Sequence, residues 1–112
     1  MNRVVVTGLG FICSIGNTSE QVVESLLLLK HGFAPFPLRE GEKAPVKLYG
    51  AIKDFNVLGL DPEEWTFPDK YKLKRSERRT MSPSVLFAHC AAMDAIADAG
   101  LSKEEVSNPR TG

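Results

Sequence analysis

The run "VVVTGLG" at residues 4–10 constrains the fold of this chain more than any other feature. Three consecutive valines form a continuous apolar run, which is typical of a strand buried on both faces of a parallel sheet. We therefore predict a buried strand over residues 3–7, ended by Gly8 and Gly10. A parallel sheet needs several strands with helices on both faces, yet only residues 46–55 offer a second candidate, with Gly50 as a possible bulge. The sequence therefore resembles a piece of a larger α/β structure.

A capping box predicts the first helix. Thr18 serves as N-cap and Gln21 reaches back to it, apolar residues follow at helical spacing, and Gly32 stands where a C-cap glycine is expected. We predict a helix that ends near residue 31, then loop over residues 33–45. Residues 56–69 contain two prolines, and we expect loop there with a turn or two of helix.

The second helix is predicted from the pair Ser82-Pro83, a serine N-cap before a proline at the first helical position, and it runs to Gly100. A short capped helix is expected after Ser102. An alanine-rich helix of this kind packs closely inside a protein. Its predicted inward stripe is made of Val85, Ala88, Ala92, Ile96 and Ala99, with Leu86, Met93 and Ala97 beside it.

Composition places the chain among soluble globular proteins. Its 112 residues are 43% hydrophobic and 25% charged, and the formal net charge is zero, which argues against a general attraction to nucleic acid or membrane surfaces. We find neither an apolar run long enough to span a membrane nor the pattern of a signal peptide, so we expect a cytoplasmic protein.

The glycine pair also raises the possibility of dinucleotide binding. That fingerprint needs a third glycine to let the helix pack closely on the strand, but Cys13 occupies its position. Gly16 comes too late, and no strand ending in an acidic residue follows the helix. A nicotinamide-dependent dehydrogenase is therefore the less favoured interpretation.

Two blocks of sequence instead resemble the β-ketoacyl-[acyl carrier protein] synthases. The first carries Thr-Gly-Leu-Gly at residues 7–10, Gly-Asn at 16–17 and Lys-x-Gly at 30–32. The second, "RRTMSPSVLFAHCAAMDAIADAGL", resembles the family's Arg-x-Met-Ser segment and the helix after it. Residues 33–77 depart from the pattern, and the connection there is longer than is usual in the family.

The resemblance implies an α/β, thiolase-like fold with α/β/α/β/α layers, of which residues 1–112 would be the N-terminal, incomplete part. The implied enzyme is a cytoplasmic, homodimeric acyltransferase of fatty-acid or related synthesis. It would condense an acyl thioester with malonyl carrier protein, losing carbon dioxide, and needs no cofactor beyond the carrier's phosphopantetheine arm. A catalytically silent, chain-length-factor type partner subunit is the alternative.

We expect no catalytic residue within this chain, because the family's nucleophilic cysteine and two histidines would lie further along. Cys13 and Cys90 show no metal-ligand spacing, and we interpret them as loop support and as a small apolar helix residue. His31 and His89 do not stand at metal-ligand spacing either. No metal site is predicted.

The basic run "KYKLKRSERR" at residues 70–79 is the main candidate for binding. A solvated basic loop is the simpler interpretation of such a run. The resemblance implies instead a contact with the acidic acyl carrier protein, because family members present basic residues just before the Met-Ser segment. Complementary charge there would steer the encounter and set its register. The implied carrier-binding residues are Arg78 and Arg79, with Lys74 and Arg75 as additions.

Overall fold

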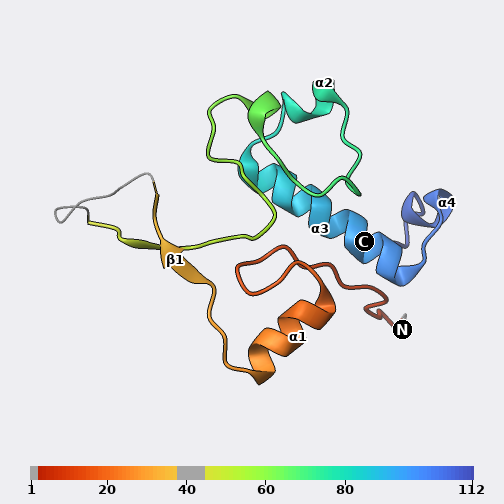
Figure 1. Cartoon of the computed structure of the whole chain (residues 1–112). Helices are drawn as coiled ribbons and strands as arrows, with labels where there is room; N and C mark the ends of the chain where they lie inside the picture. The colour runs from red at the N-terminus through yellow and green to blue at the C-terminus, as the bar shows by residue number, and fades with distance from the viewer. Residues whose placement is uncertain (1–2, 38–44) are drawn as a thin grey trace.

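The computed structural model describes residues 3–37 and 45–112, and its elements are arranged around one long helix (Figure 1). Two short strands, β1 (Phe33–Pro35) and β2 (Leu48–Gly50), form an antiparallel pair in which Phe33 lies opposite Gly50 and Pro35 opposite Leu48. The helical elements are α1 (Ser19–Leu27), the 3-10 turn η1 (Pro62–Glu64), α2 (Arg75–Arg78), α3 (Pro83–Ala99) and α4 (Lys103–Val106).

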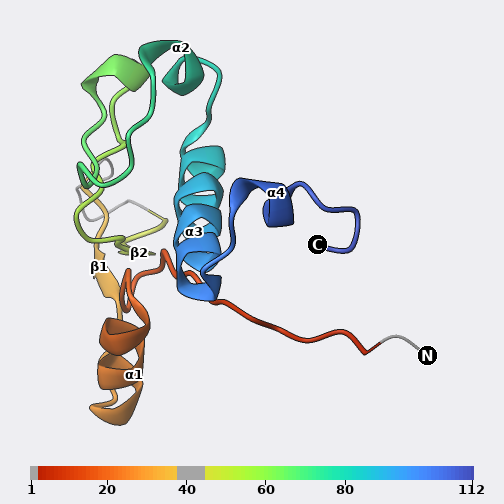
Figure 2. The ribbon, with the colours of Figure 1, turned by 90° about the vertical axis from the view of Figure 1, so that its right-hand side faces the viewer.

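The predicted buried strand at residues 3–7 is wrong for this structure. These residues form no strand, and Val4, Val5 and Val6 are 96%, 69% and 81% exposed. Figure 2 shows the segment running away past the end of α3. A strand of this kind is held by the backbone hydrogen bonds of its neighbours, and the only sheet among the described residues is the pair β1 and β2. The layered parallel arrangement is accordingly not seen in the described part of the chain.

Gly8 and Gly10, which were predicted to end a strand, have another role in the structure. Neither has a positive φ. Instead both lie against α3, where a Cβ on Gly8 would sit 2.2 Å from the carbonyl oxygen of Ala95, and one on Gly10 would sit 1.9 Å from that of Ala91. Only residues without a side chain allow the two backbones to come so close. The backbone N–H of Leu9 adds a hydrogen bond of 2.9 Å to the Asp98 carboxylate of α3.

Helix α3 confirms its predicted ends but buries a different face. Ser82 accepts a hydrogen bond from the N–H of Val85, and Gly100 closes the helix in the left-handed conformation. Its fully buried side chains are Leu86 and Cys90, whereas most of the predicted inward stripe is exposed, including Val85 and Ile96. The prediction of close packing holds for the alanine row 91, 95 and 99, which faces the two glycines.

Helix α1 also begins as predicted and ends earlier. The Thr18 hydroxyl accepts from the N–H of Gln21, although the Gln21 side chain accepts from Asn17 rather than from Thr18. The helix stops at Leu27, and Leu29, not Gly32, takes the left-handed conformation after it.

The predicted loop and strand after α1 are also only partly right. The segment predicted as loop contains β1, and the strand predicted over residues 46–55 is confirmed only at Leu48–Gly50. Gly50 pairs in regular register and forms no bulge.

The hydrophobic core lies where the sequence appeared most irregular. Trp65 and Tyr71, from the proline-rich middle of the chain, are buried against Leu86 and Cys90 of α3. Phe55 joins them, with ring centroids 5.4 Å from Phe87, 6.2 Å from Tyr71 and 6.5 Å from Phe67. Large aromatic side chains bury enough area to hold a segment that has little regular structure of its own.

We predict that residues 1–112 expressed alone do not form a stable monomeric domain. The radius of gyration is 17.0 Å, against about 13 Å for a compact chain of this length, and the apolar residues 4–6 are exposed. Exposed apolar surface of this kind is normally covered by a partner. A thermal melt of the isolated segment, followed by circular dichroism, is expected to be broad. A sharp two-state transition from a soluble monomer would contradict this.

We also predict that Gly10→Ala destabilises the purified full-length protein by about 2 kcal/mol or more, because the added methyl group meets backbone that cannot give way. Gly59→Ala is the matched control, since a Cβ there meets first the flexible end of the Glu64 side chain, at 3.3 Å. The control is expected to change stability by less than ~0.5 kcal/mol. Urea unfolding of both variants measures the difference in the free energy of unfolding. If Gly10→Ala is as stable as Gly59→Ala, the steric explanation is wrong.

Candidate functional site

A closed loop at residues 56–66 positions the first part of the candidate site. Asn56 and Thr66 exchange backbone hydrogen bonds of 2.8 and 3.0 Å, which close the loop. The buried indole of Trp65 donates to the carbonyl oxygen of Gly59 at 2.8 Å and anchors it. At its tip, the Asp61 carboxylate accepts from the N–H of Glu63 at 2.8 Å and caps η1. In Figures 1 and 2 this turn lies beside α2, away from α1.

Glu63 joins this loop to the basic helix α2. One of its carboxylate oxygens pairs with the guanidinium of Arg75, and the other accepts from Arg79, with Oε1 2.6 Å from Nη2 and 2.8 Å from Nε. The Glu63 side chain is 25% exposed, whereas those of Arg75 and Arg79 are 67% and 61% exposed. The hydrogen bonds from Arg75 and Arg79 lower the pKa of Glu63 to about 2. The Glu63 carboxylate therefore keeps its charge well below the pH at which an ordinary glutamate becomes protonated.

The other two predicted carrier-binding residues occupy different environments. Arg78 turns inward, with its guanidinium 5.7 Å from the centroid of the Phe67 ring, and its Nε is buried without a hydrogen-bond partner among the described residues. Lys74 stands exposed at the N-cap of α2, where its backbone N–H donates to the Glu77 carboxylate at 2.8 Å. The structure therefore brings Lys74, Arg75, Arg78 and Arg79 onto one short helix and its two caps, and Arg75 and Arg79 present the exposed guanidiniums.

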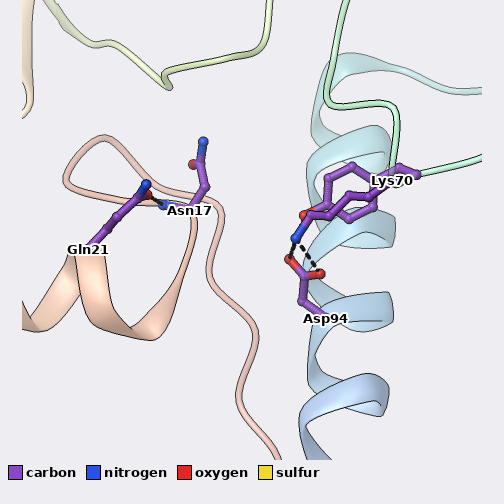
Figure 3. Close-up of polar contacts among 5 residues, drawn as sticks. Asn17, Gln21, Lys70 and Asp94 are labelled. Carbon is purple, nitrogen blue, oxygen red and sulfur yellow. Dashed lines mark hydrogen bonds and ion pairs between the residues drawn. The ribbon is translucent and has the colours of Figure 1, made fainter.

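A second polar cluster fastens the start of the basic run to α3 (Figure 3). Lys70 Nζ lies 2.9 and 3.1 Å from the two oxygens of Asp94, and the hydroxyl of Tyr71 donates to the same carboxylate at 2.5 Å. The hydrogen bond to Asp94 raises the pKa of Lys70, and burial raises that of Tyr71. Lys70 is thus occupied in holding the segment to its helix. Figure 3 also shows Gln21 bound to the backbone of Asn17 on the neighbouring loop.

The remaining candidate residues have structural roles or no shared site. Both cysteines are free thiols. Cys90 is fully buried, and burial raises its pKa to about 11, so it stays protonated and is no nucleophile. The Cys13 thiol donates to the carbonyl oxygen of Gly16 at 3.1 Å, as loop support. His31 accepts a hydrogen bond from the N–H of Phe33. Within the described ranges, no cluster of three or more metal-ligating side chains occurs, and no helix is long and apolar enough to cross a bilayer.

Two guanidiniums thus stand one helical turn apart at the start and at the C-cap of α2, and both are paired with the Glu63 carboxylate. Sequence reasoning identified the arginines but missed Glu63, their acidic partner. The turn of helix expected within residues 56–69 is confirmed as η1. The stretch "DPEE" carried a signal for its position, since an aspartate before a proline is a typical helix start.

We predict that Glu63 titrates near pH 2 in the folded protein, well below its usual 4.5. A lowered folded-state pKa stabilises the protein above the unfolded value, and that contribution is lost as the pH falls from about 4.5 towards 2. Carbon-13 NMR of the Glu63 carboxyl group measures the midpoint. In an Arg75→Ala, Arg79→Ala variant the midpoint is expected to move up, and an unchanged midpoint would show that the two pairs do not form.

Comparison with known proteins agrees with the resemblance in the sequence. The family model described as "Beta-ketoacyl synthase, N-terminal domain" matches residues 1–112. The "3-oxoacyl-[acyl-carrier-protein] synthase 1" of Haemophilus influenzae is 36% identical over the whole chain, and that of Escherichia coli strain K12 is 33% identical over the whole chain. The "3-oxoacyl-[acyl-carrier-protein] synthase 2" of Synechocystis is 32% identical over 98% of it. No solved structure gives a significant match.

The matched relatives are longer proteins, and the chain spans about a quarter of their length, 24% for Haemophilus and 25% for Escherichia. The structure also removes the basis for a dinucleotide fingerprint, because Gly8 and Gly10 lie against α3 and α1 begins only at Ser19. A family match that covers every residue, with relatives above 30% identity, leaves one assignment: this chain belongs to the β-ketoacyl synthase family, in the region of its N-terminal domain.

Proposed function

We propose that the protein containing this chain is a 3-oxoacyl-[acyl-carrier-protein] synthase with a thiolase-like fold, and that residues 1–112 form the first, incomplete part of its N-terminal half. The observation that carries the proposal is the match of the whole chain to the family's N-terminal domain and to relatives with that name. The proposed reaction is acyl transfer from carrier protein to an enzyme cysteine, followed by condensation with malonyl carrier protein. In the second step the bond between the malonyl carbon and its carboxylate breaks and carbon dioxide leaves. The electron pair left on that carbon attacks the acyl carbonyl carbon, and the enzyme cysteine leaves as the thiolate.

The proposed contribution of this chain is to bind the acyl carrier protein. The binding surface consists of Lys74, Arg75, Arg78 and Arg79, and we call it the α2 surface. The relatives' names include acyl carrier protein, which supports a carrier protein as the partner here. Arg75 and Arg79 are the exposed members that a partner carboxylate can reach. Arg78 instead places its guanidinium over the ring of Phe67.

Charge of this kind acts mainly on the encounter of the two proteins. Exposed ion pairs are individually worth only ~0–1 kcal/mol, but complementary patches raise the association rate and fix the orientation of docking. The orientation of docking depends on how rigidly α2 and the residues before it are held. Asp94 holds Lys70 and Tyr71 on α3, and Trp65 anchors the loop that faces α2. The guanidiniums therefore project from a positioned helix and not from a free loop.

The remaining parts of the proposal rest on the membership of this chain in the β-ketoacyl synthase family. We propose that the protein is cytoplasmic and homodimeric, acts in fatty-acid or related acyl-chain synthesis, and uses the carrier's phosphopantetheine arm as its only prosthetic group. The catalytically silent partner subunit is the alternative outcome of the test below.

We predict that the purified full-length protein forms 3-oxoacyl carrier protein from an acyl carrier protein and malonyl carrier protein. Reversal of Arg75 and Arg79 to Glu should lower the carrier-dependent rate by about tenfold or more at low salt, because attraction becomes repulsion. The loss should shrink at high salt, as the Debye length falls from about 10 Å at 0.1 M to about 3 Å at 1 M. Mass spectrometry of the carrier measures product formation.

A small acyl thioester that bypasses the carrier is the control substrate, and activity on it should survive the reversal. Equal loss on both substrates would show that the arginines support the fold or the active site instead. No loss on either substrate would favour the simpler interpretation, in which residues 70–79 are a solvated basic segment without a partner. Carrier binding without any condensation would favour the silent partner subunit.

A further inference from the structure

We propose that Glu63 is an internal competitor of the acidic partner: it occupies Arg75 and Arg79 in the free protein, and the partner must exchange its own carboxylates for that of Glu63. This inference rests on the proposed function of the α2 surface. It makes Glu63 a residue that sets the affinity and selectivity of docking, although Glu63 need not contact the partner itself.

The arrangement of the ion pairs supports competition. A single carboxylate uses both of its oxygens, Oε2 for Arg75 and Oε1 for Arg79. On Arg79 it takes the edge formed by Nε and Nη2, which is one of the forked edges that bind a carboxylate with two parallel hydrogen bonds. A partner carboxylate that approaches Arg79 therefore finds this edge already filled. It must either accept the poorer remaining geometry or displace Glu63.

The burial of the three side chains indicates which group moves. Glu63 is only a quarter exposed, and its backbone is fixed by Asp61 and by the anchored Trp65. Arg75 and Arg79 are about two-thirds exposed and reach Glu63 through long, flexible stems. The exchange thus consists of arginine side chains turning away from a fixed carboxylate towards the partner, with no rearrangement of α2.

This exchange has a consequence for selectivity. A partner that presents one carboxylate only replaces one exposed ion pair with another of similar strength, so it gains little. A partner with several closely spaced carboxylates can engage both guanidiniums together with Lys74, and it gains more than it displaces. Glu63 thereby favours strongly acidic protein surfaces over isolated acidic side chains. It does so by making the binding of a single carboxylate cost an ion pair that the free protein already has.

Three variants of the full-length protein test the proposal against a bacterial holo-acyl carrier protein. Glu63→Gln removes the competing charge. Glu63→Asp keeps the charge but shortens the side chain, so that it no longer reaches both arginines. Glu64→Gln is the matched control, because Glu64 lies on the same turn, is exposed and forms no ion pair within the described residues, so this variant removes a charge without removing a contact. Dissociation constants are measured at 50 mM and 500 mM salt, with thermal melting as a check on folding.

We expect Glu63→Gln to bind the carrier about 2- to 10-fold more tightly than the wild type at low salt, the range that follows from one or two exposed pairs. Glu63→Asp should show a smaller gain, Glu64→Gln less than 1.5-fold, and the differences should shrink at 500 mM salt.

If Glu63→Gln binds equally or more weakly while the wild type binds well, Glu63 orients the arginines and the competition is refuted, with the proposed function intact. If neither the wild type nor any variant binds, the proposed docking function itself fails. If Glu64→Gln gains as much as Glu63→Gln, net charge explains the effect and the exchange is refuted.

Discussion

The contact between α3 and the segment at residues 55–73 is the interaction on which the rest of the described structure depends. Leu86 and Cys90 on the helix are covered by Trp65 and Tyr71, which come from a segment with almost no regular structure. Burying side chains of this size stabilises a fold by about 1.5–3 kcal/mol each, so a few of them can order a loop that forms few hydrogen bonds of its own. Once the loop is ordered, its tip is directed at α2.

The opposite half of α3 is used in another way, and the difference explains why the helix is so rich in alanine. Near its C-terminal end, the row Ala91, Ala95 and Ala99 receives the backbone of Gly8 and Gly10 at distances that no Cβ would allow. Near its N-terminal end, larger side chains meet aromatic rings. Helix α3 therefore joins the two parts of the chain through backbone contact at one end and through side-chain contact at the other. Asp94, next to Ala95 in the sequence, adds a polar link from the helix to Lys70 and Tyr71.

How far the sequence predicted this structure depended on how local the signal was. The N-caps of α1 and α3 were predicted well, because Thr18 and Ser82 act through hydrogen bonds within three residues. The buried strand was not, because burial of Val4, Val5 and Val6 needs neighbours that the described part of the chain does not place beside them. The inward face of α3 was assigned to the wrong stripe for a related reason. In the sequence, Ala91 and Ala95 have no feature that marks them as a contact face. They become one only because Gly8 and Gly10, far away in the sequence, pack against them.

The candidate site shows the same limit for charge. The basic run was visible in the sequence, but its members were indistinguishable there, and the structure divides them by what they touch. Lys70 is held by Asp94, Arg78 covers Phe67, and Arg75 and Arg79 share Glu63. A residue twelve positions before Arg75 therefore determines how much of the charge in this run is free to meet a partner. Counting basic residues overstates the attraction of such a surface, because each charge acts on a partner only to the extent that its own chain has not already neutralised it.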